Sequence, residues 1–226
     1  MPPKEVAKEF IQAVYTGDAA KASSLVTEKT KAAVSDTKPL TPAMNAEESF
    51  SLTTLTETIN GNSAEVKNNL VKLSMEKEGN GWKVAATPEL IAAIINRQND
   101  LNELKNGWEA LQKEYDGSLQ LAKDYLQYKK GRGTLSPQMQ SLEQMVNTLS
   151  VKTTWDKEKI LLYVQRQNQL ADMIDKSLEP SFTASADISM NYILQLSAVK
   201  DRIKIAQEEY QTLAEKIPSA TYPKLP

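Results

Sequence analysis

The spacing of hydrophobic residues along the chain changes twice, near residues 50 and 88. Before residue 27 and after residue 88 they recur at steps of three and four, which is the spacing of an α-helix with one buried face. Between residues 50 and 85 they alternate with polar residues, as in a half-buried β-strand. We therefore expect an α+β fold, with a small α+β domain at residues 1–87 and an all-α domain at residues 88–226.

Two helices are expected at the start of the first domain. Phe10 and Val14 lie on one stripe of the first helix, which Gly17 can end, and Asp18 is a suitable N-cap for the second. A third helical turn through Val34 is an open alternative. Residues 35–48 contain two prolines and few large apolar side chains, so we predict an irregular segment or a single helical turn there.

An antiparallel meander of three strands is predicted at residues 50–59, 64–75 and 82–85. The dipeptide Asn60-Gly61 is a strong hairpin signal, and Gly79-Asn80-Gly81 indicates the second turn. A change of phase in the middle strand predicts a β-bulge near residues 68–69. One curved sheet folded over the two helices would bury the stripe that contains Phe10.

Three long amphipathic segments follow in the second domain. The first begins at Thr87-Pro88 and ends at Gly131, the second runs from Ser136-Pro137 to Pro180, and the third ends at Pro218. The β-branched cluster at residues 151–154 is the weakest part of the second helix. Short connections make neighbouring helices antiparallel, so we expect a three-helix bundle with an extended proline-rich tail.

The first helix of this domain has two unusual features. Leu90, Ile91, Ile94 and Ile95 give its first turns more apolar surface than a bundle requires, so we expect them to pack on the α+β domain. Glycines at positions 107 and 117 cost roughly 1 kcal/mol each relative to alanine in a helix, which indicates a kink or a close helix contact.

The composition argues against several classes of function. The 226 residues include no cysteine and no histidine, which removes thiol nucleophiles, histidine-based catalytic triads and zinc sites with nitrogen or sulfur ligands. A net charge of −2, with neither domain basic, argues against nucleic acid as a partner. No run approaches eighteen apolar residues and the first residues contain no hydrophobic signal core, so the chain as given is expected to be soluble.

Two groups of acidic residues are candidates for catalysis or for cation binding. Glu57 and Glu65 flank the first turn, but an acid/base pair would need desolvation, so we interpret them as solvated strand ends. An acidic helix face formed by Asp172, Asp175 and Glu179 is interpreted as solvated rather than as a cation site. We predict no metal site and no cofactor.

The aromatic residues of the helical part have two interpretations. Trp108, Tyr115, Tyr125 and Tyr128 would form either an aromatic site or, as we prefer at heptad positions, part of the core. Trp155 does not fall on the apolar stripe of its helix. It is therefore our candidate for an exposed residue that binds a partner.

Three stretches of the first domain together resemble a known family. They are Pro3-Lys4-Glu5-Val6-Ala7-Lys8-Glu9-Phe10, Gly17-Asp18-Ala19-Ala20-Lys21-Ala22 and Gly81-Trp82-Lys83-Val84. Over about residues 3–86 the chain resembles the small cone-shaped domain of the nuclear-transport-factor-2-like superfamily, in particular its bacterial lipoprotein branch. The resemblance implies a cone whose cavity would be lined by Phe10, Val14, Phe50, Leu52 and Trp82. It also implies export and a lipid anchor on a cysteine upstream.

Residues 166–174 and 210–218 are similar to two helices of the LemA family of envelope-associated helical proteins. Enzymes of the cone superfamily place an acid and a base inside the cone, and no residue here matches those positions. We therefore expect a non-catalytic cell-envelope protein, periplasmic or surface-exposed, that binds a protein partner or scaffolds an assembly. The alternatives are a small apolar ligand in the cone and a cytoplasmic location.

Overall fold

The computed structural model describes residues 1–34, 45–151, 154–176, 184–216 and 225, with backbone alone at residues 167–168, 170–176, 184–190 and 193. These residues combine α-helices with an antiparallel sheet, as expected for an α+β chain. They divide into two compact units, which meet between Lys105 and Asn106. The division therefore lies inside a helix, whereas the expected boundary lay at the first residue of that helix.

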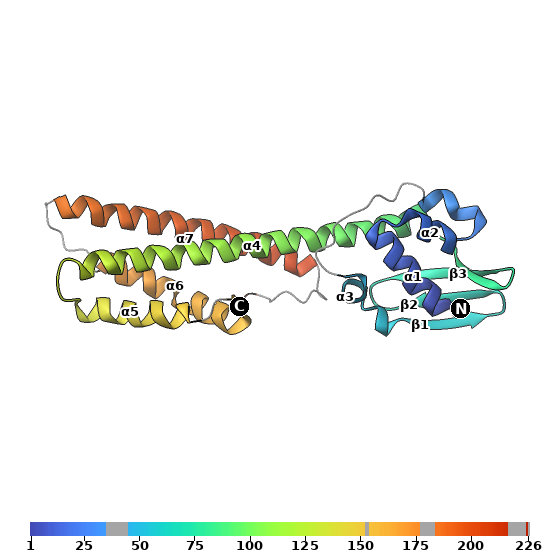
Figure 1. The fold of residues 1–226 in the computed structure, drawn as a ribbon, viewed down its shortest axis with the longest axis horizontal. Coiled ribbons are helices and arrows are strands. Elements are labelled where there is room, and N and C mark those ends of the chain that lie inside the picture. The colour runs from blue at the N-terminus through green and yellow to red at the C-terminus, as the bar shows by residue number, and fades with distance from the viewer. Residues whose placement is uncertain (35–44, 152–153, 177–183, 217–224, 226) are drawn as a thin grey trace. The chain divides into compact units, whose positions relative to one another are not determined.

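The first unit begins with helices and continues with a sheet (Figure 1). Its helical elements are α1 (Pro3–Thr16), α2 (Ala19–Leu25), the 3₁₀ helix η1 (Glu28–Val34), α3 (Ala46–Phe50) and the 3₁₀ helix η2 (Leu52–Thr54). The strands are β1 (Thr56–Asn60), β2 (Ser63–Lys67), β3 (Lys72–Glu78) and β4 (Gly81–Val84), paired antiparallel in chain order. Gly17 at φ 72° ends α1 and the Asp18 carboxylate caps α2, both as predicted.

The expected three-strand meander is wrong, because the sheet has four strands. The segment predicted as one bulged strand at residues 64–75 is two strands, β2 and β3. Asn68 makes the turn between them: its Oδ1 accepts hydrogen bonds from the backbone N–H groups of Leu70 and Val71, at 2.9 and 3.0 Å. This side-chain turn replaces the predicted bulge.

Phe50 and Leu52 were predicted to lie in the first strand, and this prediction is also wrong. Phe50 is in α3 and Leu52 is in η2. The Asn45 side chain accepts the Glu48 N–H at 2.8 Å and so caps α3. Two contacts hold α3 in place: the Tyr15 hydroxyl lies 2.7 Å from Ser49 Oγ, and Arg97 Nε donates to the Ser49 carbonyl. Alternation over three residues alone could not distinguish this short helix from a strand.

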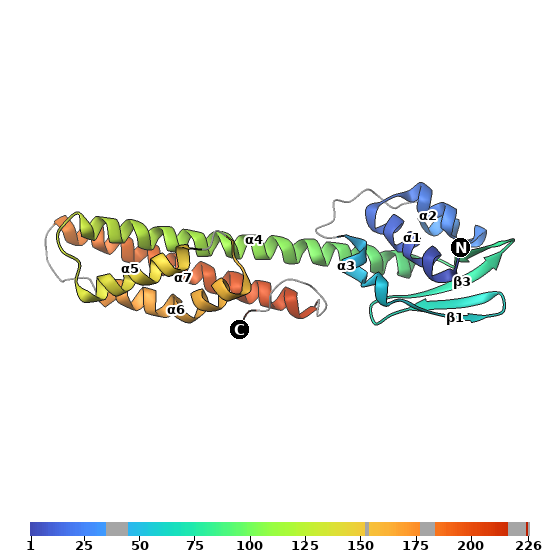
Figure 2. The same cartoon turned by 60° about the horizontal axis from the view of Figure 1, so that its bottom comes forward.

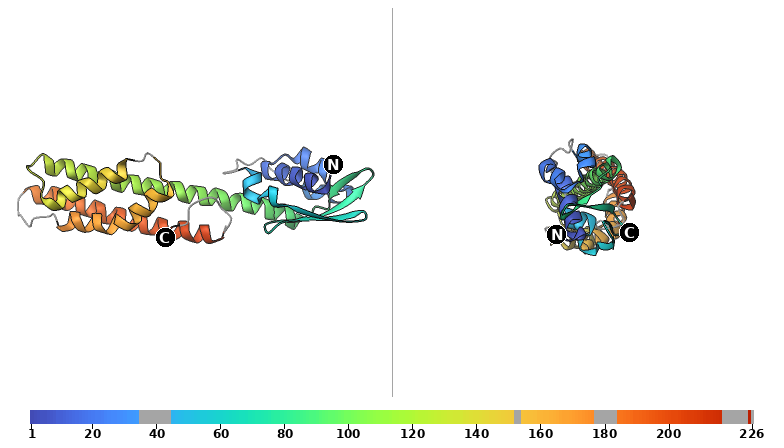
Figure 3. Two further views of the ribbon diagram at one scale, coloured as in Figure 1. Left: turned by 90° about the horizontal axis from the view of Figure 1, so that it is seen from below. Right: turned by 90° about the vertical axis from the view of Figure 1, so that its right-hand side faces the viewer.

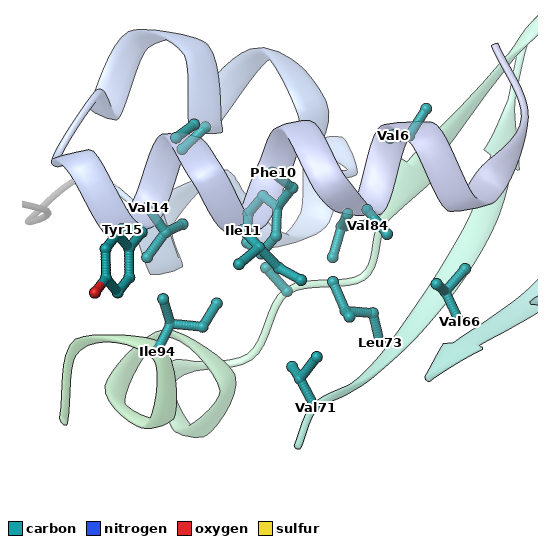
Figure 4. Close-up of a cluster of buried hydrophobic side chains, with 14 of the residues drawn as sticks. Val6, Phe10, Ile11, Val14, Tyr15, Val66, Val71, Leu73, Val84 and Ile94 are labelled. Carbon is teal, nitrogen blue, oxygen red and sulfur yellow. The ribbon is translucent and has the colours of Figure 1, made fainter. Parts of the chain in front are cut away.

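Helices α1 and α2 cover one face of the sheet (Figure 2). Figure 4 shows Phe10 and Ile11 of α1 on the side of Leu73 and Val84 of the sheet, and Val14 above Ile94. All six side chains are at most 1% exposed. The predicted burial of the α1 stripe is therefore confirmed.

The two edges of the sheet differ. The β4 edge is covered, because Val26 pairs with Val84 and the Thr27 N–H donates to the Val84 carbonyl at 3.0 Å. Within the described residues no strand pairs with the outer edge of β1, whose five residues are all exposed. The hairpin between β1 and β2 turns at Gly61, at φ 63°, as the Asn60-Gly61 signal predicted.

Helix α4 (Pro88–Lys130) contributes its first turns to the first unit. Ile91 and Ile94 belong to the buried core cluster of this unit, and Leu90 and Ile95 are partly buried against that cluster. The expected packing of these apolar residues on the α+β part is confirmed.

The second unit contains the rest of α4 with α5 (Pro137–Ser150), α6 (Lys157–Lys176) and α7 (Ala184–Lys216), and the helices run alongside one another (Figure 3). The third predicted helix is confirmed as α7. The second is wrong as a single helix, because α5 ends at Ser150 and α6 begins at Lys157. The break falls at the β-branched cluster, and Asp156 caps α6 by accepting the Lys159 N–H at 2.8 Å.

Side-chain contacts hold α7 against α4. The rings of Trp108 and Tyr210 lie 5.2 Å apart, and Arg202 Nε is 3.1 Å from Glu114 Oε2. A methyl group added at Gly107 would lie 3.6 Å from Leu213 Cδ1, whereas one at Gly117 would meet nothing within 4 Å. Of the two helical glycines, Gly107 therefore faces a close helix neighbour.

Candidate functional site

The five residues expected to line a cavity belong to the core of the first unit. Phe10, Val14, Phe50 and Leu52 are between 0% and 3% exposed, and Trp82 is partly buried against them. Three clefts lined by described residues lie elsewhere, one on the outer face of the sheet and two in the second unit. These side chains act as core residues that pack on one another.

Glu57 and Glu65 lie on opposite faces of the sheet, since Glu57 is in register with the buried Val66, which directly follows Glu65. Glu57 Oε2 accepts the N–H of Lys4 at 2.8 Å and so serves the first turn of α1. Glu65 is 2.6 Å from both Lys67 Nζ and Lys72 Nζ, and hydrogen bonds from these two lysines lower the pKa of its carboxyl to about 2. The two carboxylates cannot act together on one substrate.

Trp155 is 7% exposed, so the expectation of an exposed partner-binding side chain is wrong. Its indole Nε1–H donates to Asp116 Oδ1 at 2.8 Å, and its ring lies 4.7 Å from that of Tyr115 and 5.3 Å from that of Tyr163. The residue precedes α6 rather than lying within a helix. Helical spacing therefore did not apply to it, and it turns inward.

The cluster around Trp155 joins α4, α6 and α7 by polar contacts in a buried setting. Lys159 Nζ lies 4.2 Å from the centre of the Trp155 ring, and burial lowers the pKa of Lys159. The Tyr115 hydroxyl accepts a hydrogen bond from Gln207 Nε2 at 3.0 Å. Burial raises the pKa of Tyr163. The rings of Tyr115, Trp155 and Tyr163 and the Lys159 side chain are buried, so we interpret the cluster as part of the core.

An open cleft lies between the end of α4 and the early part of α7. Its volume is about 560 Å³, and it is lined by Asp124, Gln127, Tyr128, Gly131, Arg132 and Tyr192. The Tyr192 ring lies 5.9 Å from that of Tyr128 and 5.3 Å from that of the buried Tyr125. The Arg132 guanidinium lies over the Tyr128 ring, 5.6 Å from its centre, and Nη1 donates to the Tyr128 hydroxyl at 3.1 Å.

Local sequence explains how this tyrosine–arginine cleft forms. Tyr125 and Tyr128 are three residues apart, which places them on neighbouring positions of one helix face. The Gly131 N–H donates to the Gln127 carbonyl at 3.1 Å, and Gly133 at φ 143° then takes the chain out of the helix. Arg132 is thereby held beside the last turn of α4. Sequence reasoning assigned both tyrosines to the core, which fits Tyr125, but Tyr128 is only half-buried.

A second cleft, of about 530 Å³, lies mainly over the outer face of the sheet. Most of its lining is polar, including Thr58, Ser63, Glu65 and Lys67. An antiparallel sheet commonly leaves one face in water, and the ion pairs of Glu65 are typical of such a face.

Within the described residues no group of three or more acidic side chains is placed to hold a metal ion. The side chains of Asp172 and Asp175 and all of Glu179 lie outside those residues, so the interpretation of that acidic face stays a prediction. Among the described helices, none has an apolar stretch long enough to cross a membrane. Comparisons of the sequence and the fold with protein-family models, curated proteins and solved structures gave no match.

Proposed function

We propose that this chain is a non-catalytic interaction or scaffolding module of the bacterial cell envelope. In this proposal the first unit is a nuclear-transport-factor-2-like cone of the lipoprotein type, and the helical unit is an antiparallel bundle related to LemA. The envelope location rests on the resemblance of residues 3–86, with a lipid anchor on a cysteine upstream. The observation that carries the interaction role is the open cleft of Tyr128, Arg132 and Tyr192.

The side chains of this cleft suit a protein partner. Tyrosine and arginine are enriched among the residues that contribute most to binding at protein interfaces. Ring contacts already hold Tyr128 and Tyr192, and Tyr128 holds Arg132, so binding would immobilise few additional side-chain torsions.

The absence of cysteine and histidine and the separation of Glu57 from Glu65 support a non-catalytic role. The alternative, a small apolar ligand inside the cone, needs open space beside Phe10, Val14, Phe50, Leu52 and Trp82. The packing of these side chains on one another favours the interaction role.

The test is in-cell crosslinking and affinity capture with the full chain expressed from its native gene. Tyr192→Ala and Arg132→Ala should each lower recovery of the crosslinked partner at least several-fold. Leu194→Ala is the matched control, because Leu194 is also on α7 and is 62% exposed but does not line the cleft. Equal partner recovery from all four proteins would overturn the proposal.

A further inference from the structure

We propose that the tyrosine–arginine cleft binds a segment of the protein partner that carries a carboxylate beside an aromatic side chain. This inference rests on the proposed function and names the chemistry of the partner at that same site.

Tyr128 holds the Arg132 side chain in place. One of the Arg132 N–H groups is donated to the Tyr128 hydroxyl, and the guanidinium carbon lies 5.6 Å from the centre of the Tyr128 ring. Within the described residues Arg132 forms no ion pair. A guanidinium has five N–H donors in a fixed plane and matches a carboxylate through two parallel hydrogen bonds. Arg132 is therefore held in position, and the described residues leave most of its donors unused.

The tyrosine hydroxyls add further hydrogen-bond donors to the cleft. The Tyr128 hydroxyl accepts from Arg132, which leaves its own proton to donate, and the Tyr192 hydroxyl makes no hydrogen bond to any described residue. Among the described lining residues Asp124 is the acidic one, and its Oδ1 accepts from Gln120 Nε2 at 2.8 Å. The two tyrosine hydroxyls and the remaining N–H groups of Arg132 together favour a ligand that carries a strong acceptor group.

The cleft also contains aromatic surface. Tyr128 and Tyr192 are both half-buried and border the open volume, so each has ring surface available to an apolar group. Aromatic pairs in offset or edge-to-face contact are stabilising beyond the area that they bury. A ligand with an aromatic ring beside a carboxylate could contact the tyrosine rings and form hydrogen bonds with Arg132 at the same time.

A peptide fits these observations better than an anionic membrane does. Membrane surfaces attract clusters of about four to eight basic residues. Near this cleft Lys130 is paired with Glu143, Lys129 lies over the Tyr125 ring, and the lining itself contains Asp124.

The test is a titration of the isotopically labelled full chain with two blocked dipeptides, acetyl-Phe-Glu-amide and acetyl-Phe-Gln-amide, followed through the backbone amide signals of residues 131–133. The two probes differ only in the carboxylate. We expect the glutamate probe to bind about three- to tenfold more tightly, as for an exposed but well-oriented ion pair. Arg132→Gln should abolish that preference, Tyr192→Leu should weaken both probes, and Leu194→Ala should change neither.

Equal binding of the two dipeptides, or a preference that survives in Arg132→Gln, would overturn the inference. So would binding of inorganic phosphate as tight as that of the glutamate probe, or Arg132-dependent binding to phosphatidylglycerol vesicles without peptide binding. If crosslinking to a partner still depends on Tyr192 while the carboxylate preference is absent, the interaction role stands and only the partner chemistry is wrong.

Discussion

Leucine substitutions at the two glycines of α4 should have opposite effects on stability. A side chain at Gly107 points toward Leu213 and the fully buried Tyr210, whereas the space beside Gly117 is open. Alanine should stabilise the helix at either position by about 0.4–1 kcal/mol, because it restricts the unfolded chain and its methyl group fits in both places. At Gly107 that methyl would lie at ordinary contact distances of 3.6 and 3.8 Å.

Leucine separates the two positions. At Gly117 it should stabilise the helix about as much as alanine does, because no atom lies in its way. At Gly107 the larger side chain meets α7, and such overpacking costs about 1–3 kcal/mol. The measurement is urea unfolding of the full chain, followed by circular dichroism and by tryptophan fluorescence, since Trp108 contacts Tyr210. If Gly107→Leu proves as stable as Gly117→Leu, α7 does not pack on α4 at this point.

Three further outcomes follow from the described contacts. Trp155→Ala should destabilise the second unit by about 3–5 kcal/mol in urea unfolding. The control Val151→Ala, at a position 80% exposed, should change stability by less than about 0.5 kcal/mol. Similar values for both variants would contradict the burial of the indole. Ile94→Ala should destabilise the first unit by about 2–5 kcal/mol because Ile94 is fully buried, and a neutral effect in thermal unfolding would show that α4 does not complete that core. The pKa of Glu65 is lowered in the folded chain, so the stability that its ion pairs contribute is present above pH 4.5 and is lost as the pH falls toward 2. In urea unfolding, the free energy of Glu65→Gln should therefore differ from that of the parent at pH 7. The two values should converge near pH 2.

Short-range signals account for the parts of the fold that the sequence predicted well. Four such signals determine backbone geometry through hydrogen bonds or torsions within a few residues. They are Asp18, Asn60-Gly61, Thr87-Pro88 and Ser136-Pro137. Such signals give a similar local structure whatever the rest of the chain does. Helix starts and the first hairpin were therefore predictable.

The errors arose where one side chain or a distant contact decides the structure. Asn68 turns the chain without a glycine or proline, so two strands looked like one strand with a bulge. Trp155 lies inward because Asp116, about forty residues earlier, accepts its N–H. The cleft requires Tyr192 beside Tyr128, and no local pattern records that pairing across more than sixty residues.

Residues 26 and 27 close one edge of the sheet, and no described strand pairs with the other edge, so protection against unwanted strand pairing there depends on β1 itself. Ile59 is 53% exposed at this edge and would favour addition of a foreign strand. Glu57 opposes it, since a charged residue in a short edge strand makes such addition costly. The same carboxylate accepts a hydrogen bond from the Lys4 N–H in the first turn of α1. Glu57 therefore stabilises the start of α1 and also disfavours aggregation through the edge of the sheet.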